Sequence, residues 1–142
     1  QLALLKRHPE LMPGAVEEFL RYDSSVQLTG RVALEDIDDV GGRPVPRGES
    51  VLCLLGSANR DERAFPDPDV FDIERTSEHQ VAFGRGIHFC LGAALARMEA
   101  RIALNALLDK VPDWDVDLES ARRLRSGPIR GYTSLPITWA TG

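Results

Sequence analysis

The chain has 142 residues, of which 43% are hydrophobic and 27% charged, and it carries a formal net charge of −5. This length and balance are typical of one globular domain that buries its own core. The negative charge argues against nucleic acids or anionic membrane surfaces as partners, and the apolar runs are shorter than the roughly 20 residues that span a bilayer.

The first elements expected are two helices. Gln1 to Arg7 is apolar and helical in character, and His8-Pro9 ends it because the residue before a proline avoids the helical region. Pro13 suits the first position of a second helix, whose apolar face extends to about Tyr22. The sequence thus predicts two consecutive helices separated by a short break.

Extended patterns follow these helices. Val26–Leu28 and Arg31–Leu34 are short strand candidates, and Gly41-Gly42 is typical of a hairpin turn. Ser50 to Leu55 is a continuous apolar run, which favours a buried strand. We therefore expect a small sheet in this region.

The second half combines a long coil, a long helix and short strands. Gly56 to Cys90 has no sustained period and is expected to be an ordered wrap, because such long loops are uncommon unless functional. Leu91 to Lys110 has apolar residues at helical spacing and is expected to end at Pro112. Trp114 to Leu118 alternates like a strand, and Gly131 to Trp139 predicts a final pair of strands.

The most informative segment is Phe-Gly-Arg-Gly-Ile-His-Phe-Cys-Leu-Gly, residues 83–92. It places Cys90 at the end of a glycine-rich loop, directly before the long helix. A thiolate there faces the positive end of a helix dipole, and glycines provide backbone conformations that other residues avoid. This environment is typical of a metal-ligating or reactive sulfur.

Four interpretations of Cys90 compete. A buried structural thiol is the common fate of a free cysteine, and it is the one we favour for Cys53 in its apolar strand. A zinc site needs three or four ligands, whereas only His88 and Cys90 lie close together in the sequence. A cysteine nucleophile needs an oriented base, and His88 is expected to point to the opposite side of an extended loop. A haem thiolate needs one sulfur, a helix terminus and a tight loop under a flat ring, and all three are present.

Residues 83–92 resemble the haem-binding loop of the cytochrome P450 family in its soluble bacterial form, with every fixed position filled. Glu18-Phe19-Leu20-Arg21 resembles the family's Glu-x-x-Arg motif in the helix called K. Asn59-Arg60-Asp61 and Phe65 to Asp72 resemble the segment that follows, and Gly131 to Trp139 resembles the closing hairpin. The resemblance covers nearly the whole chain but only the C-terminal part of the family fold.

The resemblance implies a haem b cofactor with Cys90 as the axial ligand of the iron. Phe83 would pack near the sulfur, whose donation the following backbone N–H groups would tune. His88 and Arg31 would hold the haem propionates, although each alone is more simply a solvated surface residue. The cofactor-binding residues implied are Phe83, Gly84, Gly86, His88, Cys90, Gly92 and Arg31.

The resemblance also makes Glu18 and Arg21 a buried brace for the cysteine loop. At spacing i, i+3 the two side chains can meet, and the plainer interpretation is an exposed helix pair. The family often completes this pair with an arginine just before the residue equivalent to Phe71, where this chain has Val70. Arg75 and Arg63 are the candidates for the missing partner.

Substrate contacts are implied for one segment and one bend of the chain, with ordinary strand packing as the alternative. These residues are Val26, Gln27, Leu28 and Thr29, and Leu135 at the bend before Pro136. The resemblance further implies a small-molecule substrate and a ferredoxin-type electron donor. An acidic donor would be steered by the arginines on the cysteine side, which are Arg85, Arg97 and Arg101.

Family members are longer and carry a helix with an acid–threonine pair that relays protons to oxygen, a pair that we do not find in this sequence. We therefore expect one α+β domain, residues 1–142, with two main helices, small antiparallel sheets and a long ordered coil, lacking the distal half of the fold. The chain would be a fragment, a natural truncation, or one of two chains that pair. Two free cysteines predict a reduced, cytoplasmic location.

The leading function is a haem-thiolate monooxygenase, or the haem-ligating part of one, that inserts one oxygen atom from O2 into a small organic molecule. The isolated chain is not expected to be competent. The alternative is a truncated, non-catalytic relative that acts as a haem-binding or dimerising module, and a small zinc protein is a third interpretation.

Overall fold

The computed structural model describes residues 1–111 and 113–139, so the expectation that Pro112 ends the long helix falls outside the described residues. The helical elements are α1 (Leu2–Arg7), η1 (Pro9–Leu11), α2 (Met12–Tyr22), α3 (Leu55–Ala58), η2 (Gly86–His88) and α4 (Ala93–Lys110). The strands are β1 (Thr29–Val32), β2 (Ser50–Cys53), β3 (Trp114–Val116), β4 (Arg122–Arg123), β5 (Tyr132–Ser134) and β6 (Ile137–Trp139).

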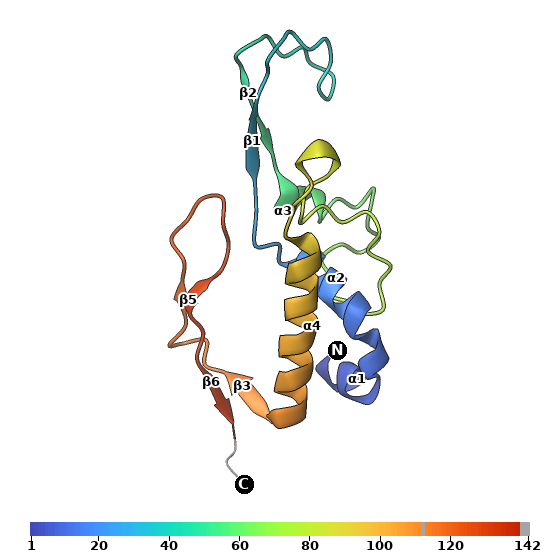
Figure 1. The fold of residues 1–142 in the computed structure, drawn as a ribbon, viewed down its shortest axis with the longest axis vertical. Coiled ribbons are helices and arrows are strands. Elements are labelled where there is room, and N and C mark those ends of the chain that lie inside the picture. Colours follow the sequence, from blue (N-terminus) through green and yellow to red (C-terminus); the bar gives the residue numbers. More distant parts are fainter. Residues whose placement is uncertain (112, 140–142) are drawn as a thin grey trace.

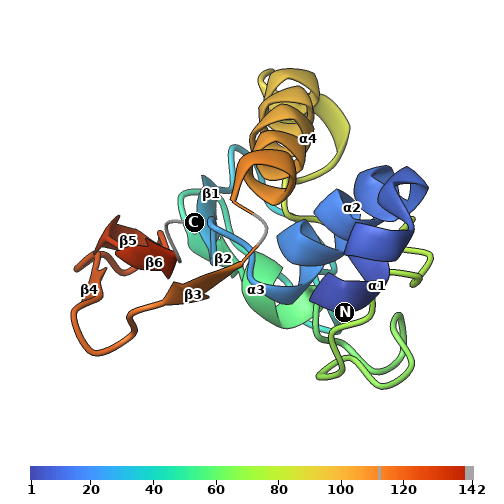
Figure 2. The same ribbon diagram turned by 90° about the horizontal axis from the view of Figure 1, so that it is seen from below.

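The strands form three antiparallel pairs, β1 with β2, β3 with β6 and β4 with β5. Both views of the molecule place α1 and α2 on one side of α4 and strands β5 and β6 on its other side (Figures 1 and 2). This arrangement confirms the expected α+β class with two main helices, small sheets and a long coil. Within the described residues, none of the helices is both long and apolar enough to cross a bilayer.

The core lies where α1, α2 and α4 meet. Leu5, Met12, Ala15, Val16 and Ile73 are buried there, because the apolar face of α2 turns toward both neighbouring helices. Helix α4 contributes residues that recur every fourth position along the same face, namely Ala100, Leu104 and Leu108. This packing fixes α2 against α4, and residues 83–92 lead directly into α4.

The other apolar side of α4 is exposed, which differs from the single packed stripe that its sequence suggests. Leu95, Met98 and Ile102 of α4 are all exposed, as is Leu91 two residues before the helix begins, and we call these four residues the α4 stripe. The spacing of three and four residues from Leu95 to Ile102 aligns the helical members along one line of α4. An apolar line of this kind is typical of a surface that another element covers.

The strand predictions are partly wrong in position and burial. Val26–Leu28 is not a strand and forms only an isolated bridge between Val26 and Ile129, while the strand expected at Arg31–Leu34 begins earlier, at Thr29. Strand β2 is half exposed rather than buried, and Leu52 is 62% exposed, because a two-stranded sheet covers only one of its faces. The Gly41-Gly42 turn is confirmed, with φ angles of +63° and +90°.

The final strands also differ from the prediction. β5 and β6 do not pair with each other; β6 pairs with β3 and β5 pairs with β4. Only Leu135 and Pro136 separate β5 from β6. Each strand takes its partner from the preceding segment, which gives two nested antiparallel pairs.

Candidate functional site

The cysteine loop is closed by its own backbone. Cys90 N–H donates to the Phe83 carbonyl at 2.9 Å, and Phe89 N–H donates to the Gly86 carbonyl at 3.0 Å. Gly84 and Gly86 have φ angles of +72° and +66°, a left-handed conformation that favours glycine. Cys90 thus lies three residues before the start of α4, with an exposed thiol.

A buried amide anchors the loop to helix α2. Asn59 is fully buried, donates to the Ser24 hydroxyl at 2.7 Å and accepts from Val81 N–H at 2.7 Å. Ser24 in turn donates to the Leu20 carbonyl of α2 at 2.8 Å. Because an unpaired buried amide is costly, these hydrogen bonds hold Val81, at the start of the loop, in a fixed position next to α2.

The predicted brace of Glu18 and Arg21 is present and fully buried. Arg21 Nε and Nη2 donate to the two carboxylate oxygens of Glu18 at 2.7 and 2.8 Å. Arg21 Nη1 also donates to the carbonyls of Asn59 and Pro68, at 2.9 and 2.8 Å. The brace therefore ties α2 to the long coil, and the plainer interpretation as an exposed helix pair is wrong.

Arg75 supplies the partner that is missing at Val70. Its Nε lies 3.4 Å from Glu18 Oε1, and its Nη1 and Nη2 donate to the carbonyls of Pro66 and Asp67 at 2.6 and 3.0 Å. Arg63, the other candidate, is exposed and pairs with Asp61 at 2.6 Å. The Arg63 hydrogen bond lowers the pKa of Asp61 to about 2.

The charges around Glu18 decide its protonation. Burial raises its pKa, but the hydrogen bond from Arg21, the Asp72 N–H and the charges of Arg21 and Arg75 outweigh burial, so the pKa is below its ordinary value. Glu18 is therefore a carboxylate at neutral pH, held by two arginines.

Cys90 opens onto a hollow of about 570 Å³. Of the predicted site residues, Phe83, Gly84, His88, Cys90, Arg31, Val26 and Thr29 line it, and so does Cys53. Gly86 and Gly92 lie in the loop beside it. Gln27 lines a separate hollow, Leu28 is half-buried, and Leu135 is exposed between β5 and β6. The structure thus brings the predicted haem residues together and only two of the five predicted substrate residues with them.

The chemistry of this hollow fits a haem group. Its walls provide the Cys90 thiol for an iron, with Cys53 as a second thiol, and basic side chains for carboxylates, namely His88, Arg31 and Arg85. At Gly92 a Cβ atom would lie 3.9 Å from Cys90 Sγ, so glycine leaves the space beside the sulfur open. Among the described residues there is no group of three or more His, Cys, Asp or Glu side chains that could hold a metal ion, which argues against the zinc interpretation.

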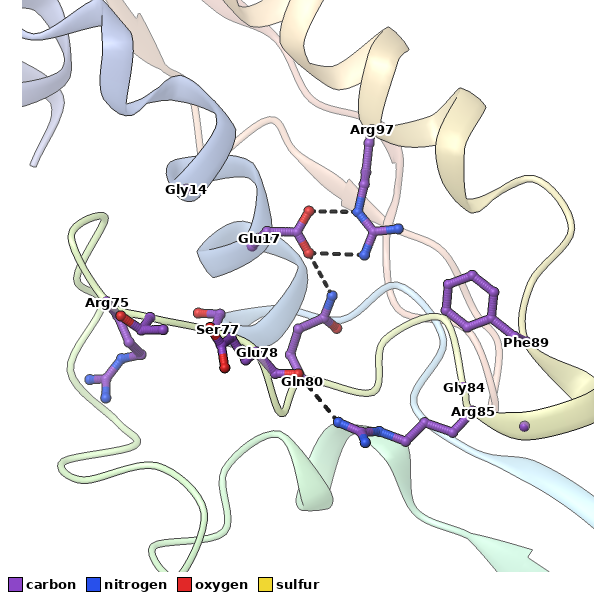
Figure 3. A pocket seen from close by; sticks show the side chains of 12 residues that line it. Gly14, Glu17, Arg75, Ser77, Glu78, Gln80, Gly84, Arg85, Phe89 and Arg97 are labelled. Carbon is purple, nitrogen blue, oxygen red and sulfur yellow. Dashed lines mark hydrogen bonds and ion pairs between the residues drawn. The ribbon is translucent and has the colours of Figure 1, made fainter.

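On the side of the loop next to α2, charged and polar side chains line much of a second hollow of about 850 Å³ (Figure 3). Glu17 of α2 and Arg97 of α4 both line it and bind each other, with Arg97 Nη2 donating to Glu17 Oε2 at 2.9 Å. Gln80 Nε2 donates to the same oxygen at 2.9 Å. Arg85 also lines this hollow and donates to the Glu78 carbonyl at 3.3 Å, whereas Arg101 is exposed on α4.

Sequence reasoning missed several of these residues. Asn59 stands in a segment that resembles a family motif, but nothing in its sequence neighbourhood shows that it is buried. Glu17 and Gln80 have no local signal, because their partner Arg97 lies on a distant helix. Arg97, one of the arginines expected to steer an electron donor, also forms an ion pair with Glu17.

Comparison with known proteins agrees with this geometry. The family profile described as Cytochrome P450 matches residues 7–116. The chain is 49% identical over 138 residues to a putative cytochrome P450 140 of Mycobacterium tuberculosis, covering 96% of this chain and 31% of that protein. It is 48% identical over 140 residues to the biotin biosynthesis cytochrome P450 of Bacillus subtilis, covering 98% of this chain and 35% of that protein.

A solved structure is similar as well. P450BioI, crystallised in complex with a hexadec-9Z-enoic acid ligated acyl carrier protein, superimposes with a TM-score of 0.92 at 46% identity. The match covers 99% of this chain and 36% of that one, so the chain spans about a third of the length of its relatives. The chain belongs to the cytochrome P450 family, whose cofactor is haem b held by a cysteine thiolate.

Proposed function

We propose that this chain is the haem-ligating part of a cytochrome P450 monooxygenase that inserts one oxygen atom from O2 into a small organic substrate. Residues 1–142 would form one domain of that enzyme, with the distal half of the haem pocket supplied by residues outside this chain. The observation that carries the proposal is the exposed Cys90 thiol in a hollow that also contains His88 and Arg31.

The residues of the chain would divide the work. Cys90 would ligate the iron, and His88 and Arg31 would bind the two propionates and so fix the orientation of the ring. Phe83 would pack beside the sulfur, and Val26 and Thr29 would contact the substrate, as would Gln27, Leu28 and Leu135 in the complete pocket. Bound haem supplies the oxygen chemistry, and a thiolate ligand pushes electron density toward the iron to favour O–O cleavage.

Electrons would come from a ferredoxin-type protein in the cytoplasm. Exposed Arg85 and Arg101 lie on the cysteine side and are suited to an acidic partner, because charge complementarity steers association. Arg97 is less suited, since Glu17 already neutralises it.

Haem titration tests the proposal. The purified chain is mixed with hemin under reducing conditions, and the Soret band is followed before and after reduction and addition of CO. We expect the strong CO shift of a thiolate ligand, its loss in Cys90→Ala, and its retention in the matched variant Cys53→Ala, whose thiol lines the same hollow. A chain that stays colourless, or a shift that survives Cys90→Ala, would refute the ligand assignment.

A second candidate is a non-catalytic haem-binding or dimerising module, and the α4 stripe favours it. Three exposed apolar side chains on α4, with Leu91 just before the helix, suit self-association when no other element covers them. Sedimentation of the wild type and of a Leu95→Gln, Ile102→Gln double variant distinguishes the two candidates. A dimer that the double variant abolishes supports the module, and substrate-coupled oxygenation by the isolated chain would exclude it.

A further inference from the structure

Two adjacent carboxylates of α2 hold two different parts of the molecule. Glu18 points into the brace with Arg21 and Arg75, whereas Glu17 points toward α4 and binds Arg97. The Arg97 guanidinium donates from both Nε and Nη2 to the Glu17 carboxylate, and Gln80 Nε2 donates a third hydrogen bond at 2.9 Å (Figure 3). The side chains of Glu17 and Arg97 are 29% and 28% exposed, so solvent screens this pair only in part.

Arg97 has a second contact that leads to the cysteine. Its guanidinium carbon lies 4.8 Å from the centre of the Phe83 ring, within the range of a cation–π interaction. The carbonyl of the same Phe83 accepts the Cys90 N–H at 2.9 Å. The path from Glu17 to Arg97, Phe83 and Cys90 therefore joins helix α2 to the ligand residue through contacts at every step.

Charge is also shared between these residues. The hydrogen bond that Arg97 donates to Glu17 raises the pKa of Arg97 against the opposing effect of burial, with smaller contributions from the charges of Glu17 and of Cys90. Burial raises the pKa of Glu17, but hydrogen bonds from Arg97 and Gln80 outweigh it, so that pKa is lowered. Both groups therefore stay charged at neutral pH, one neutralising the other beside the loop.

We propose that Glu17 and Arg97 are a positioning pair that holds Phe83 against the cysteine loop and sets the net charge felt by the Cys90 sulfur. This inference rests on the proposed function, because it concerns the sulfur as a haem ligand. The positive charge of Arg97 stabilises negative charge on the Cys90 sulfur, and the negative charge of Glu17 partly cancels this effect.

The reduction potential of the bound haem tests the charge effect. Removing the cation in Arg97→Gln leaves a carboxylate beside the loop, which disfavours the added electron and lowers the potential. Removing the carboxylate in Glu17→Gln leaves the cation uncompensated and raises the potential. At a fixed solution potential we expect the ratio of reduced to oxidised haem to fall about fivefold in Arg97→Gln and to rise about fivefold in Glu17→Gln. This is the order expected of one partly screened charge at an effective dielectric constant near 20.

Three further variants complete the design. Arg97→Lys keeps the charge and is expected to lie between the wild type and Arg97→Gln. Glu99→Gln and Arg122→Gln make the same charge changes at exposed positions of α4 and β4, where solvent screens the charge, and are expected to leave the ratio within about twofold. Shifts of the two main variants in the same direction, or shifts no larger than those of the controls, would overturn the proposal.

Hydrogen exchange of the haem-free chain tests positioning without the cofactor. The Cys90 amide is expected to exchange at least about threefold faster in Arg97→Gln, with recovery in Arg97→Lys and with the amides of α2 unchanged. An unchanged Cys90 amide would overturn the positioning role. A wild-type chain that takes up no haem would refute the proposed function instead, and the exchange result would still decide on the pair.

Discussion

Arg75 Nε lies 3.4 Å from Glu18 Oε1, at a fully buried carboxylate that also binds Arg21. Glu18 also accepts the Asp72 N–H at 3.0 Å, so one glutamate of α2 joins its own helix to two points of the coil that leads to Cys90. Because a buried charge is stable only when it is fully paired, each of the three residues depends on the other two.

The first prediction concerns this dependence. Arg75→Gln removes a charge from Glu18 and donors from the carbonyls of Pro66 and Asp67, so we expect the free energy of unfolding to fall by about 3 kcal/mol. Urea titration followed by circular dichroism measures it. The control Arg63→Gln breaks only an exposed pair and is expected to change the free energy by less than about 0.5 kcal/mol. Equal losses in the two variants would contradict the role of Arg75.

The second prediction concerns Asn59. Asn59→Leu leaves the Ser24 hydroxyl and the Val81 N–H without their partner, and we expect a loss of about 2–3 kcal/mol in unfolding free energy. Hydrogen exchange should show faster exchange at Val81 before the helices are affected. Asn105→Leu, an exposed position on α4, is the matched control and is expected to be close to neutral. A stable Asn59→Leu chain with a protected Val81 amide would disprove the anchor.

The third prediction separates backbone conformation from space. Gly86 has a φ of +66° and no atom within 4 Å of a built Cβ, so Gly86→Ala tests conformation alone. We expect about 1–2 kcal/mol of destabilisation and weaker haem uptake, because an L-residue resists the left-handed region. Gly127→Ala has the same open surroundings without a positive φ and is expected to change the stability very little. Thermal melts measure the stability of each variant, and equal losses in the two would contradict a conformational role for Gly86.

The fourth prediction concerns pH. The pKa values of Glu17 and Glu18 are lowered in the folded chain, so the unfolded chain binds more protons wherever these groups titrate. Their contribution to stability is complete above the ordinary glutamate pKa of about 4.3 and is lost as the pH falls through the lowered values. The urea concentration at the denaturation midpoint is expected to stay level from pH 7 to about the ordinary glutamate pKa and to fall below it. A Glu17→Gln variant should show a shallower fall, and an unchanged slope would contradict the assignment.

The sequence revealed those parts of the molecule that local spacing encodes. Glu18 and Arg21 stand one helical turn apart, and the glycines of the cysteine loop precede a clear helical period, so both were predictable. Glu17 and Arg97 meet only because α2 packs on α4, and no local pattern reports such a contact. The pairing of β5 with β4 and of β6 with β3 was missed for the same reason, since short strands choose partners through the fold around them.

The burial of α4 was misjudged for a different reason. Its apolar residues occupy two sides of the helix, and hydropathy alone does not say which side meets a neighbour within the same chain. Ala100, Leu104 and Leu108 meet α1 and α2, whereas the α4 stripe remains exposed. Because the relatives are about three times as long as this chain, a segment outside residues 1–142 could cover the α4 stripe.

The exposure of the Cys90 thiol has a practical chemical consequence. An exposed thiol is open to oxidation, first to a sulfenic acid, which reductants restore, and then to sulfinic and sulfonic acids, which they do not. Oxidation of Cys90 beyond the first stage would permanently remove the sulfur that the proposed haem iron needs, so the chain should be kept reduced until haem is added.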